Sequence, residues 1–408
     1  MSGDVTSILA GRMFEYVRNV AAFGPREDAS QADGKVAEYI ASVLTEAGLD
    51  VQRQSIPAWV TEPIKTSLQI LGPSQLELEC RQGTLSGVTG TAGVTGELAY
   101  VNKGFPSDLV GKDLAGKIAI AWQERYWEGG DQPREKVRRA AEMGAVGFIF
   151  AMKRRDGLIT CWGLGSTPAP IPFVSVSYPD FLALGERIQS GPVRATLRVL
   201  GQPRQTQSYN VWAVVRGTVL PDEVIGVGSG HHDTVPWNPG ANDNASGQAV
   251  LLELARFFQA HPQKRTILLL SNGGEETGLW GASGFIEANR EWLSKSLKAM
   301  VVMDQIGTAE PLVYAGTTEW LEKAWIDEAE KLGYRLVHCH DQAIIGYHGA
   351  HGDATPFYDA GFPTAFCCAW PTDWFYHTTE DTLDKVYANV LKGVADSTAA
   401  LLMRLASR

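Results

Sequence analysis

Short apolar runs alternate with helical stretches in the C-terminal half of the chain, and this alternation constrains the fold more than any other feature. The runs are EVIGVGSG, RTILLLSN, LKAMVVMDQIG and TAFCCAW. A stretch with helical periodicity, SGQAVLLELARFFQA, separates the first two runs. Strands that are buried on both faces appear as continuous apolar runs. The chain from about residue 208 therefore predicts an α/β sheet covered by helices.

The N-terminal half contains two different sequence patterns. Residues 30–48 place apolar side chains on one helical face, which predicts an amphipathic helix. Residues 60–200 carry short alternating segments with frequent glycine and proline, which is typical of a β-rich unit. We therefore predict a discontinuous catalytic domain, residues 1–59 and 205–408, and an inserted domain, residues 60–204.

The composition limits which classes of binding partner and which cellular compartment are expected. The 46 acidic residues exceed the 36 basic ones, and a net charge of −10 argues against nucleic acid or an anionic membrane as partner. The chain has neither a signal-peptide pattern nor an apolar stretch of the ~18 residues that span a bilayer. The five cysteines have no CxxC spacing. We expect a cytoplasmic protein that acts on short peptides or small amides, with a homo-oligomer left open.

Acidic and histidine residues follow the predicted strands. Ligands of open α/β sheets bind beyond the carboxyl ends of the strands, so these residues are the site candidates. His231 and Asp233 follow the first run and share one side of an extended chain, which suits Asp233 to orient the imidazole. The candidate metal ligands are His231, Asp243, Glu276, Asp304 and His377.

Each candidate taken alone has a structural explanation. Asp243 precedes a predicted helix, where an anion is favourable, and the Glu275–Glu276 pair would be solvated on a surface loop. Five candidates at successive strand ends instead favour a metal site. Carboxylates and imidazoles suit Zn²⁺, with Mn²⁺ or Co²⁺ as alternatives.

Five ligands exceed what one tetrahedral ion takes, so we predict two ions bridged by Asp243. His231 with Asp304 would complete one ion, and Glu276 with His377 the other. A shared water would fill the remaining positions. Glu275, left without a metal, is predicted to be the general base that takes the proton of this water.

The motifs HHDT, GANDNASG, GGEETGLWGASGF, VVMDQIG and YHTTEDT resemble, in order, those of co-catalytic zinc aminopeptidases of clan MH, which include glutamate carboxypeptidase II and bacterial leucyl aminopeptidases. Residues 60–200 resemble the protease-associated domain of that family. The resemblance implies a three-layer α/β/α sandwich with a mixed sheet and a β-rich lid. It also implies hydrolysis of N-terminal peptide bonds, Tyr376 as a donor to the oxyanion, and a cis peptide at Asp243–Asn244.

The chain departs from this family in the segment GYHGAHGDATPFYDAG. The family commonly has a histidine after the aspartate, whereas here Ala354 follows Asp353. The side-chain preference of the enzyme is therefore not predicted. His348 and His351 in the same segment are candidates to face the site, although histidines flanked by glycine are more often simply exposed.

Other functions are weighed against this one. HHDTVP also matches aminoacylases and dipeptidases, but these have a longer gap before the bridging aspartate and an extra domain placed later. Glutaminyl cyclases use one zinc ion, and receptor-like homologues lose ligands that this chain retains. Hydrolysis of a small non-peptide or N-acyl amide stays open. Four tryptophans close to the ligands would suit an apolar group or simply pack in the core: Trp237, Trp280, Trp370 and Trp374.

The inserted domain is predicted to fold over the strand ends as a lid, because both of its connections enter the same region of the catalytic domain. Pockets form preferentially at such domain interfaces. Trp122, Tyr126 and Trp127 are the residues expected to reach the site from the lid. The competing expectation is that they pack within it.

Overall fold

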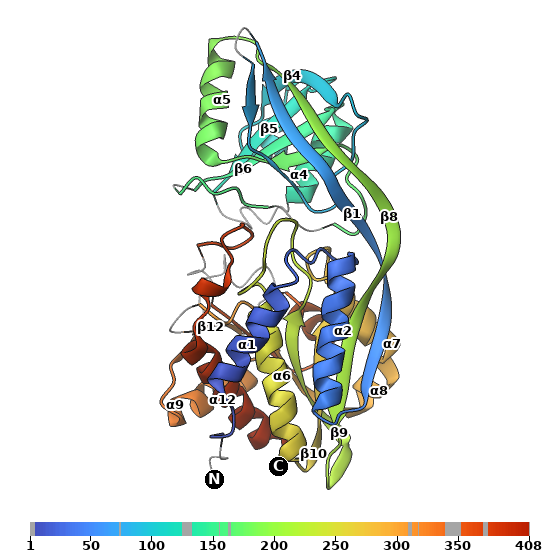
Figure 1. The fold of residues 1–408 in the computed structure, drawn as a ribbon, viewed down its shortest axis with the longest axis vertical. Coiled ribbons are helices and arrows are strands. Elements are labelled where there is room, and N and C mark those ends of the chain that lie inside the picture. The colour runs from blue at the N-terminus through green and yellow to red at the C-terminus, as the bar shows by residue number, and fades with distance from the viewer. Residues whose placement is uncertain are drawn as a thin grey trace.

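The computed structural model describes residues 5–407 except 73–74, 125–132, 155, 162–164, 309–311, 317, 339–351 and 370–373. Two lobes are joined by a long two-stranded ribbon (Figure 1). Among the described residues, no helix is long and apolar enough to span a membrane.

The catalytic lobe is built on a mixed sheet. Its strands are Arg194–Val215 (β8), Leu220–His231 (β9), Arg265–Asn272 (β10), Leu297–Met303 (β11), Leu312–Gly316 (β12), Leu336–His338 (β13) and Thr364–Cys368 (β14). They run in the order β13–β12–β14–β11–β9–β10–β8. The four strands β14, β11, β9 and β10 are parallel, whereas β8 and β12 pair antiparallel with their neighbours β10 and β14. The predicted apolar runs are thus the central strands.

Helices cover this sheet on both faces, as the apolar runs require. Ile267 and Leu269 of β10 belong to one buried cluster, and Leu268 and Leu270 belong to another. The first cluster includes side chains of Ala10–Ala21 (α1), Gln31–Glu46 (α2), Ala245–Ala260 (α6), Glu319–Lys331 (α9) and Ala388–Ala406 (α12). The second includes Trp280–Ala288 (α7), Arg290–Ser296 (α8) and Ala354–Asp359 (α11). The predicted three-layer α/β/α sandwich is confirmed (Figure 1).

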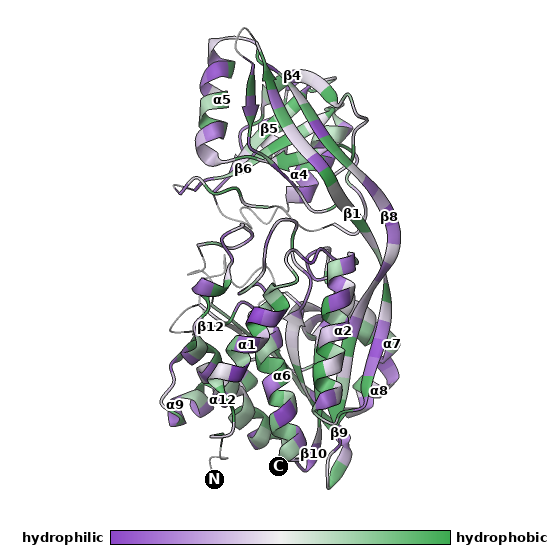
Figure 2. Ribbon diagram, in the orientation of Figure 1, coloured by the Kyte–Doolittle hydropathy of each residue, from purple (hydrophilic) through white to green (hydrophobic). Residues whose placement is uncertain are grey.

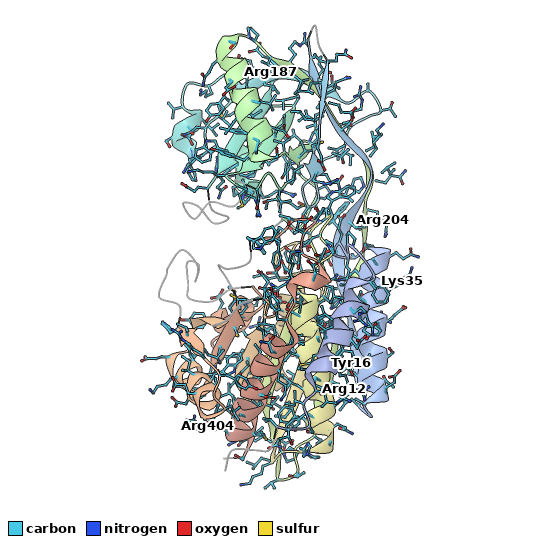
Figure 3. The ribbon with its side chains drawn as sticks, turned by 60° about the vertical axis from the view of Figure 1, so that its left-hand side comes forward. Arg12, Tyr16, Lys35, Arg187, Arg204 and Arg404 are labelled. Atoms are coloured by element: carbon cyan, nitrogen blue, oxygen red, sulfur yellow. The ribbon has the colours of Figure 1, made fainter. Side chains whose placement is uncertain are left out.

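The N-terminal helices belong to the catalytic lobe. The Arg12 guanidinium of α1 lies 2.7 Å from the Glu253 carboxylate of α6, and Figure 3 labels Arg12 on the outer surface of this layer. Burial of Glu253 beside this cation ties α1 to the central helix. The chain therefore enters the catalytic lobe, leaves it and returns.

The other lobe, called the inserted lobe, has its own apolar cores. Its strands are Leu76–Leu78 (β2), Arg81–Gln82 (β3), Val94–Tyr100 (β4), Ile118–Gln123 (β5), Gly147–Met152 (β6) and Phe173–Ser175 (β7). Its helices are Pro106–Leu109 (α3), Pro133–Glu142 (α4) and Tyr178–Ser190 (α5). Strands β4 to β7 are parallel, and two apolar clusters cover their faces.

The ribbon consists of Val51–Leu71 (β1) and β8, which pair antiparallel along their length. Trp59 lies opposite Gln205, and Val60 lies opposite Arg204. The two predicted domain boundaries, 59/60 and 204/205, therefore lie opposite each other on the ribbon. As domain boundaries they stay a prediction. Between the lobes β8 is hydrophilic (Figure 2), and Figure 3 labels Arg204 there.

Candidate metal centre

The predicted ligands gather at the carboxyl edge of the parallel strands. His231 is the last residue of β9, and Asp304 follows β11. Asp243 precedes α6, whose N-terminus is capped by Asn244 through its side-chain oxygen and the Gly247 N–H. Glu276 follows β10, and His377 lies on the segment after β14. Parallel strands end at the same edge, which is why ligands far apart in sequence meet here.

Asp243 lies between the two histidines. Its Oδ1 is 3.2 Å from His231 Nε2, and its Oδ2 is 3.3 Å from His377 Nε2. Asp304 Oδ1 is 3.5 Å from His231 Nε2. Glu276 Oε1 is 3.3 Å from His377 Nε2. Asp243 is therefore shared by two groups of three side chains, one with His231 and Asp304 and one with Glu276 and His377.

The donor set fits two divalent cations. In each group the ligand atoms lie within 4.8 Å of one another. The side chains are buried, and among the described residues Asp243 Oδ2, Glu276 Oε1 and Asp304 Oδ1 form no hydrogen bond, although an imidazole Nε2 lies within 3.5 Å of each. A buried carboxylate without a partner is costly unless a cation or a proton neutralises it. Oxygen and imidazole ligands at this spacing suit Zn²⁺.

The pKa values of the centre reflect its burial and its excess of carboxylates. Burial raises the pKa of Glu276 and of Asp304, because it disfavours the charged carboxylate. Burial alone would lower the pKa of His377, but the Glu276 and Asp243 carboxylates outweigh it and raise this pKa to about 10. The excess of negative charge at the centre therefore attracts positive charge.

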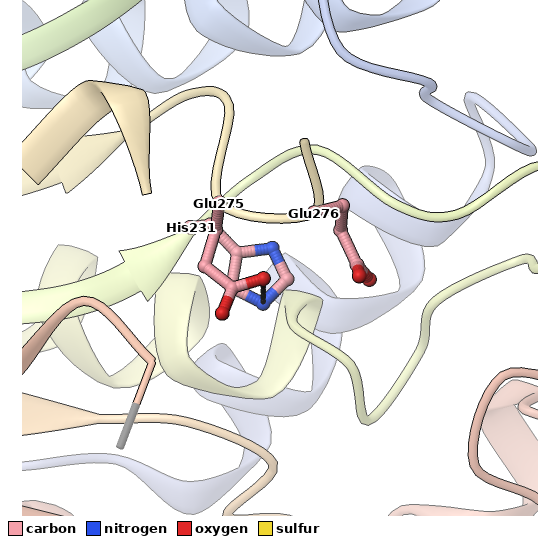
Figure 4. Close-up of side chains that lie close together, drawn as sticks. All are labelled: His231, Glu275 and Glu276. Atoms are coloured by element: carbon pink, nitrogen blue, oxygen red, sulfur yellow. Dashed lines mark ion pairs between the residues drawn. The ribbon is translucent and has the colours of Figure 1, made fainter. Parts of the chain in front are cut away.

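Glu275 lies at the open side of the centre. Its carboxylate is 4.0 Å from His231 Nε2 (Figure 4), and its side chain is 14% exposed, more than those of the ligands around it. Burial raises its pKa well above the ordinary value, and the Glu276 and Asp353 carboxylates add to this shift. His231, Glu275 and Glu276 form a third group of potential ligands. The position of Glu275 therefore fits two roles, that of a general base and that of a metal ligand.

Asp233 contacts the centre through both its backbone oxygen and its carboxylate. His231 Nδ1 lies 3.0 Å from the backbone oxygen of Asp233 and 3.5 Å from its carboxylate. The carboxylate accepts the backbone N–H groups of Glu275 at 3.2 Å and Glu276 at 3.1 Å. The Asp233 backbone thus orients the imidazole, while the side chain fixes the two glutamates.

Two buried residues that sequence reasoning missed hold the loop around Asp243. Asp381 accepts the backbone N–H groups of Asn242 and Asp243. Arg26 donates to the carbonyl oxygens of the loop at three positions: His232, Pro239 and Gly240. Asp381 lies in the segment HTTEDT, and Arg26 lies in the segment GPRE. Neither segment has a spacing or periodicity that identifies the residue as a support of this loop. The peptide bond between Asp243 and Asn244 is cis, as the resemblance implied.

Tyr376, Asp353 and Trp122 are three further predicted residues that the structure describes. The Tyr376 ring stacks on His377 with centroids 3.7 Å apart and packs against the inserted lobe. Asp353 is buried, and burial raises its pKa to about 7. Trp122 packs inside the inserted lobe, 5.9 Å from the Tyr178 ring, so the expectation that it reaches the site is wrong. Five other predicted residues lie outside the described residues: Tyr126, Trp127, His348, His351 and Trp370.

Comparisons with known proteins place this arrangement in a family. Residues 210–402 match peptidase family M28, and residues 94–184 match the PA domain. Aminopeptidase YwaD of Bacillus subtilis (strain 168) is 28% identical over 393 residues, which cover 93% of this chain and 81% of that protein. Carboxypeptidase Q of Xenopus laevis is 27% identical over 407 residues, with 92% and 82% covered.

Solved structures agree over nearly the whole chain. An aminopeptidase from Aneurinibacillus sp. strain AM-1 is 27% identical with a TM-score of 0.75, covering 98% of this chain and 94% of that one. A peptidase M28 precursor from Shewanella amazonensis SB2B shares the fold at 22% identity, with a TM-score of 0.83 and coverage of 98% and 93%.

The α/β/α sandwich, the cluster of acids and imidazoles at its strand ends and these matches define a metallopeptidase. The catalytic lobe carries the match to peptidase family M28, and the PA domain is inserted between the first two helices and the rest of that lobe.

Proposed function

We propose that this chain is a metal-dependent aminopeptidase that binds two divalent cations, Zn²⁺ above others. The observation that supports it most directly is the position of Asp243, which presents one oxygen toward each histidine. One cation would be held by His231, Asp243 and Asp304, and the other by Asp243, Glu276 and His377. The relatives named as aminopeptidases support the direction of cleavage.

Bound cations would supply Lewis acidity, which lowers the pKa of water and polarises the scissile carbonyl. Glu275 takes a proton from the attacking water and passes it to the departing amine. Its greater exposure supports this role over that of a ligand. Tyr376, beside His377, donates a hydrogen bond to the oxyanion as the tetrahedral intermediate forms. Asp233 keeps His231 and the two glutamates in place.

Hydrolysis of a small non-peptide amide is the alternative substrate class. Trp280 is 40% exposed and follows Glu276 in the sequence, whereas Trp374 is 51% exposed and precedes His377. Exposed indole rings of this kind suit an apolar substrate group. Aminoacyl-anilides, N-acyl amides and peptides blocked at the N-terminus would separate aminopeptidase, amidase and carboxypeptidase activity on the same preparation.

The dinuclear centre is tested by metal content. Elemental analysis should find two tightly held ions per wild-type chain and fewer than two in Asp243→Ala. Asp50→Ala, which removes an exposed carboxylate from the catalytic lobe, is the matched control and should keep both ions. One ion in the wild type, retained by Asp243→Ala, would contradict the proposal.

A cytoplasmic location and a homo-oligomeric state stay predictions. Four of the described cysteines are buried thiols, which is compatible with a reducing compartment: Cys80, Cys161, Cys367 and Cys368. Fractionation of cells and light scattering of the purified chain would test the two predictions.

A further inference from the structure

The PA domain touches the metal centre through the segment that carries His377. We call residues 374–377 the His377 loop. The Cys161 N–H of the PA domain donates to the His377 backbone oxygen at 2.7 Å. The Arg154 guanidinium, also from the PA domain, donates to the Trp374 backbone oxygen. Tyr376, between these two points, packs against the apolar cluster of Phe148 and Phe150. Three contacts thus connect one loop of four residues to the PA domain.

The ligands of the other metal position are held within the catalytic lobe. The His231 backbone oxygen accepts from the Gln248 side chain of α6 at 2.6 Å. The Asp304 N–H donates to the Cys367 oxygen of β14 at 2.9 Å. Both of these backbone contacts lie within the catalytic lobe, one with α6 and one with β14. The two metal positions therefore differ in which domain holds them.

The Arg154 guanidinium is held in place by burial and by Asp156. Its side chain is only 11% exposed, and Asp156 fixes the guanidinium from two sides, with Nε–Oδ1 at 3.1 Å and a second nitrogen to Oδ2 at 2.7 Å. Such a planar fork limits the rotation of the guanidinium. Arg154 follows β6 by two residues, so the sheet of the PA domain sets where this donor stands.

We propose that the PA domain positions His377 and thereby sets the affinity of one metal position, that of Asp243, Glu276 and His377, while leaving that of His231, Asp243 and Asp304 unchanged. Arg154 is the positioning residue of this device and acts through the His377 loop. The inference rests on the proposed dinuclear centre. It assigns the PA domain a part in cofactor retention, beyond that of covering the site.

The test is a titration of metal-free protein with Zn²⁺, with calorimetry and a competing chelator to resolve the two affinities. Arg154→Ala should weaken one affinity by roughly 10-fold to 100-fold, the range found when groups that orient a metal ligand are removed. The other affinity should change less than about twofold. Arg154→Lys should fall between wild type and Arg154→Ala, because lysine keeps the charge but cannot form the fork.

Arg138→Ala is the matched control. Arg138 lies on α4 of the same domain, is exposed, and pairs with Glu135 and Glu142 within its own helix. Its removal should leave both affinities unchanged. Asp156→Asn provides a second variant that weakens the hold on Arg154 without touching it, and circular dichroism verifies that each variant is folded.

The outcomes separate the two levels of the proposal. Two sites in the wild type with unchanged affinities in folded Arg154→Ala would overturn the role of the PA domain and leave the dinuclear centre standing. Equal weakening of both sites would overturn the selective effect. A single site in the wild type would overturn the dinuclear proposal together with this inference.

Discussion

Asp381 Oδ2 accepts the backbone N–H of Asp243 at 3.0 Å, so the residue shared by the two groups of potential metal ligands is itself held by a second carboxylate. The other oxygen of Asp381 accepts the Asn242 N–H at 2.7 Å. Burial raises the pKa of Asp381 to about 7, with the Asp243 carboxylate adding to the shift. The Asp381 carboxylate thus holds the backbone of Asn242 and Asp243 in place.

Asp381→Ala should therefore weaken metal binding. The substitution leaves two buried N–H groups without an acceptor and frees the backbone of Asp243. We expect a loss of roughly 10-fold to 100-fold in affinity. Asp381→Asn, which keeps one oxygen acceptor, should lose less. Glu380→Ala removes a neighbouring charge and serves as the control. Zinc titration of the metal-free variants gives the affinities, and wild-type affinity in Asp381→Ala would refute the role of Asp381.

Glu275→Gln should strongly reduce turnover while the ions stay bound. Glutamine keeps the shape of the side chain but cannot accept the proton of the attacking water. The rate constant kcat should fall by roughly 10²–10⁴, with little change in KM. Glu276→Gln offers the contrast, because it alters a ligand and should lower metal content. Near-normal turnover in Glu275→Gln would assign the base to another group.

Arg26→Ala should destabilise the fold strongly. The guanidinium is fully buried and donates to the backbone oxygens of His232, Pro239 and Gly240. Its removal leaves these carbonyls without their donor, which should lower the free energy of unfolding by at least ~3 kcal/mol. Arg18→Ala, at an exposed ion pair with Glu15, should cost less than ~1 kcal/mol. Urea denaturation of both variants measures the difference.

Asp28→Asn should change how stability depends on pH. Burial raises the pKa of Asp28 to about 7, with the Asp233 carboxylate adding to it, while the unfolded chain has the ordinary value of 3.8. The folded state therefore holds the proton more tightly. The resulting stability is complete below the unfolded pKa and is lost as the pH rises through about 7.

Asparagine cannot ionise, so the variant should lose less stability than the wild type between pH 5 and pH 8. The expected difference is about 1 kcal/mol or more, since one pKa unit corresponds to ~1.4 kcal/mol. Denaturation at the two pH values, with exposed Asp50→Asn as control, provides the measurement. Parallel pH profiles for wild type and Asp28→Asn would show that Asp28 does not titrate in this range.

Local chemistry in the sequence determined the sheet and the place of the centre. Leu268 and Leu270 face one helical layer while Ile267 and Leu269 face the other, because successive side chains of a strand alternate. Polar residues after such strands have to collect at one edge, since the strands are parallel. The positions of His231, Asp243 and Glu276 after the predicted strands were therefore enough to predict that these residues lie close together.

Tertiary structure alone decided what holds those residues. Asp381 reaches Asp243 across 138 positions, and Arg26 reaches Pro239 across 213. Contacts between a side chain and a distant backbone group leave no periodicity or spacing in the sequence, because any residue can supply an N–H or a carbonyl. The same reason hid the contact of Cys161 with His377. Residue types indicated the chemistry, whereas chain topology selected the backbone groups that position it.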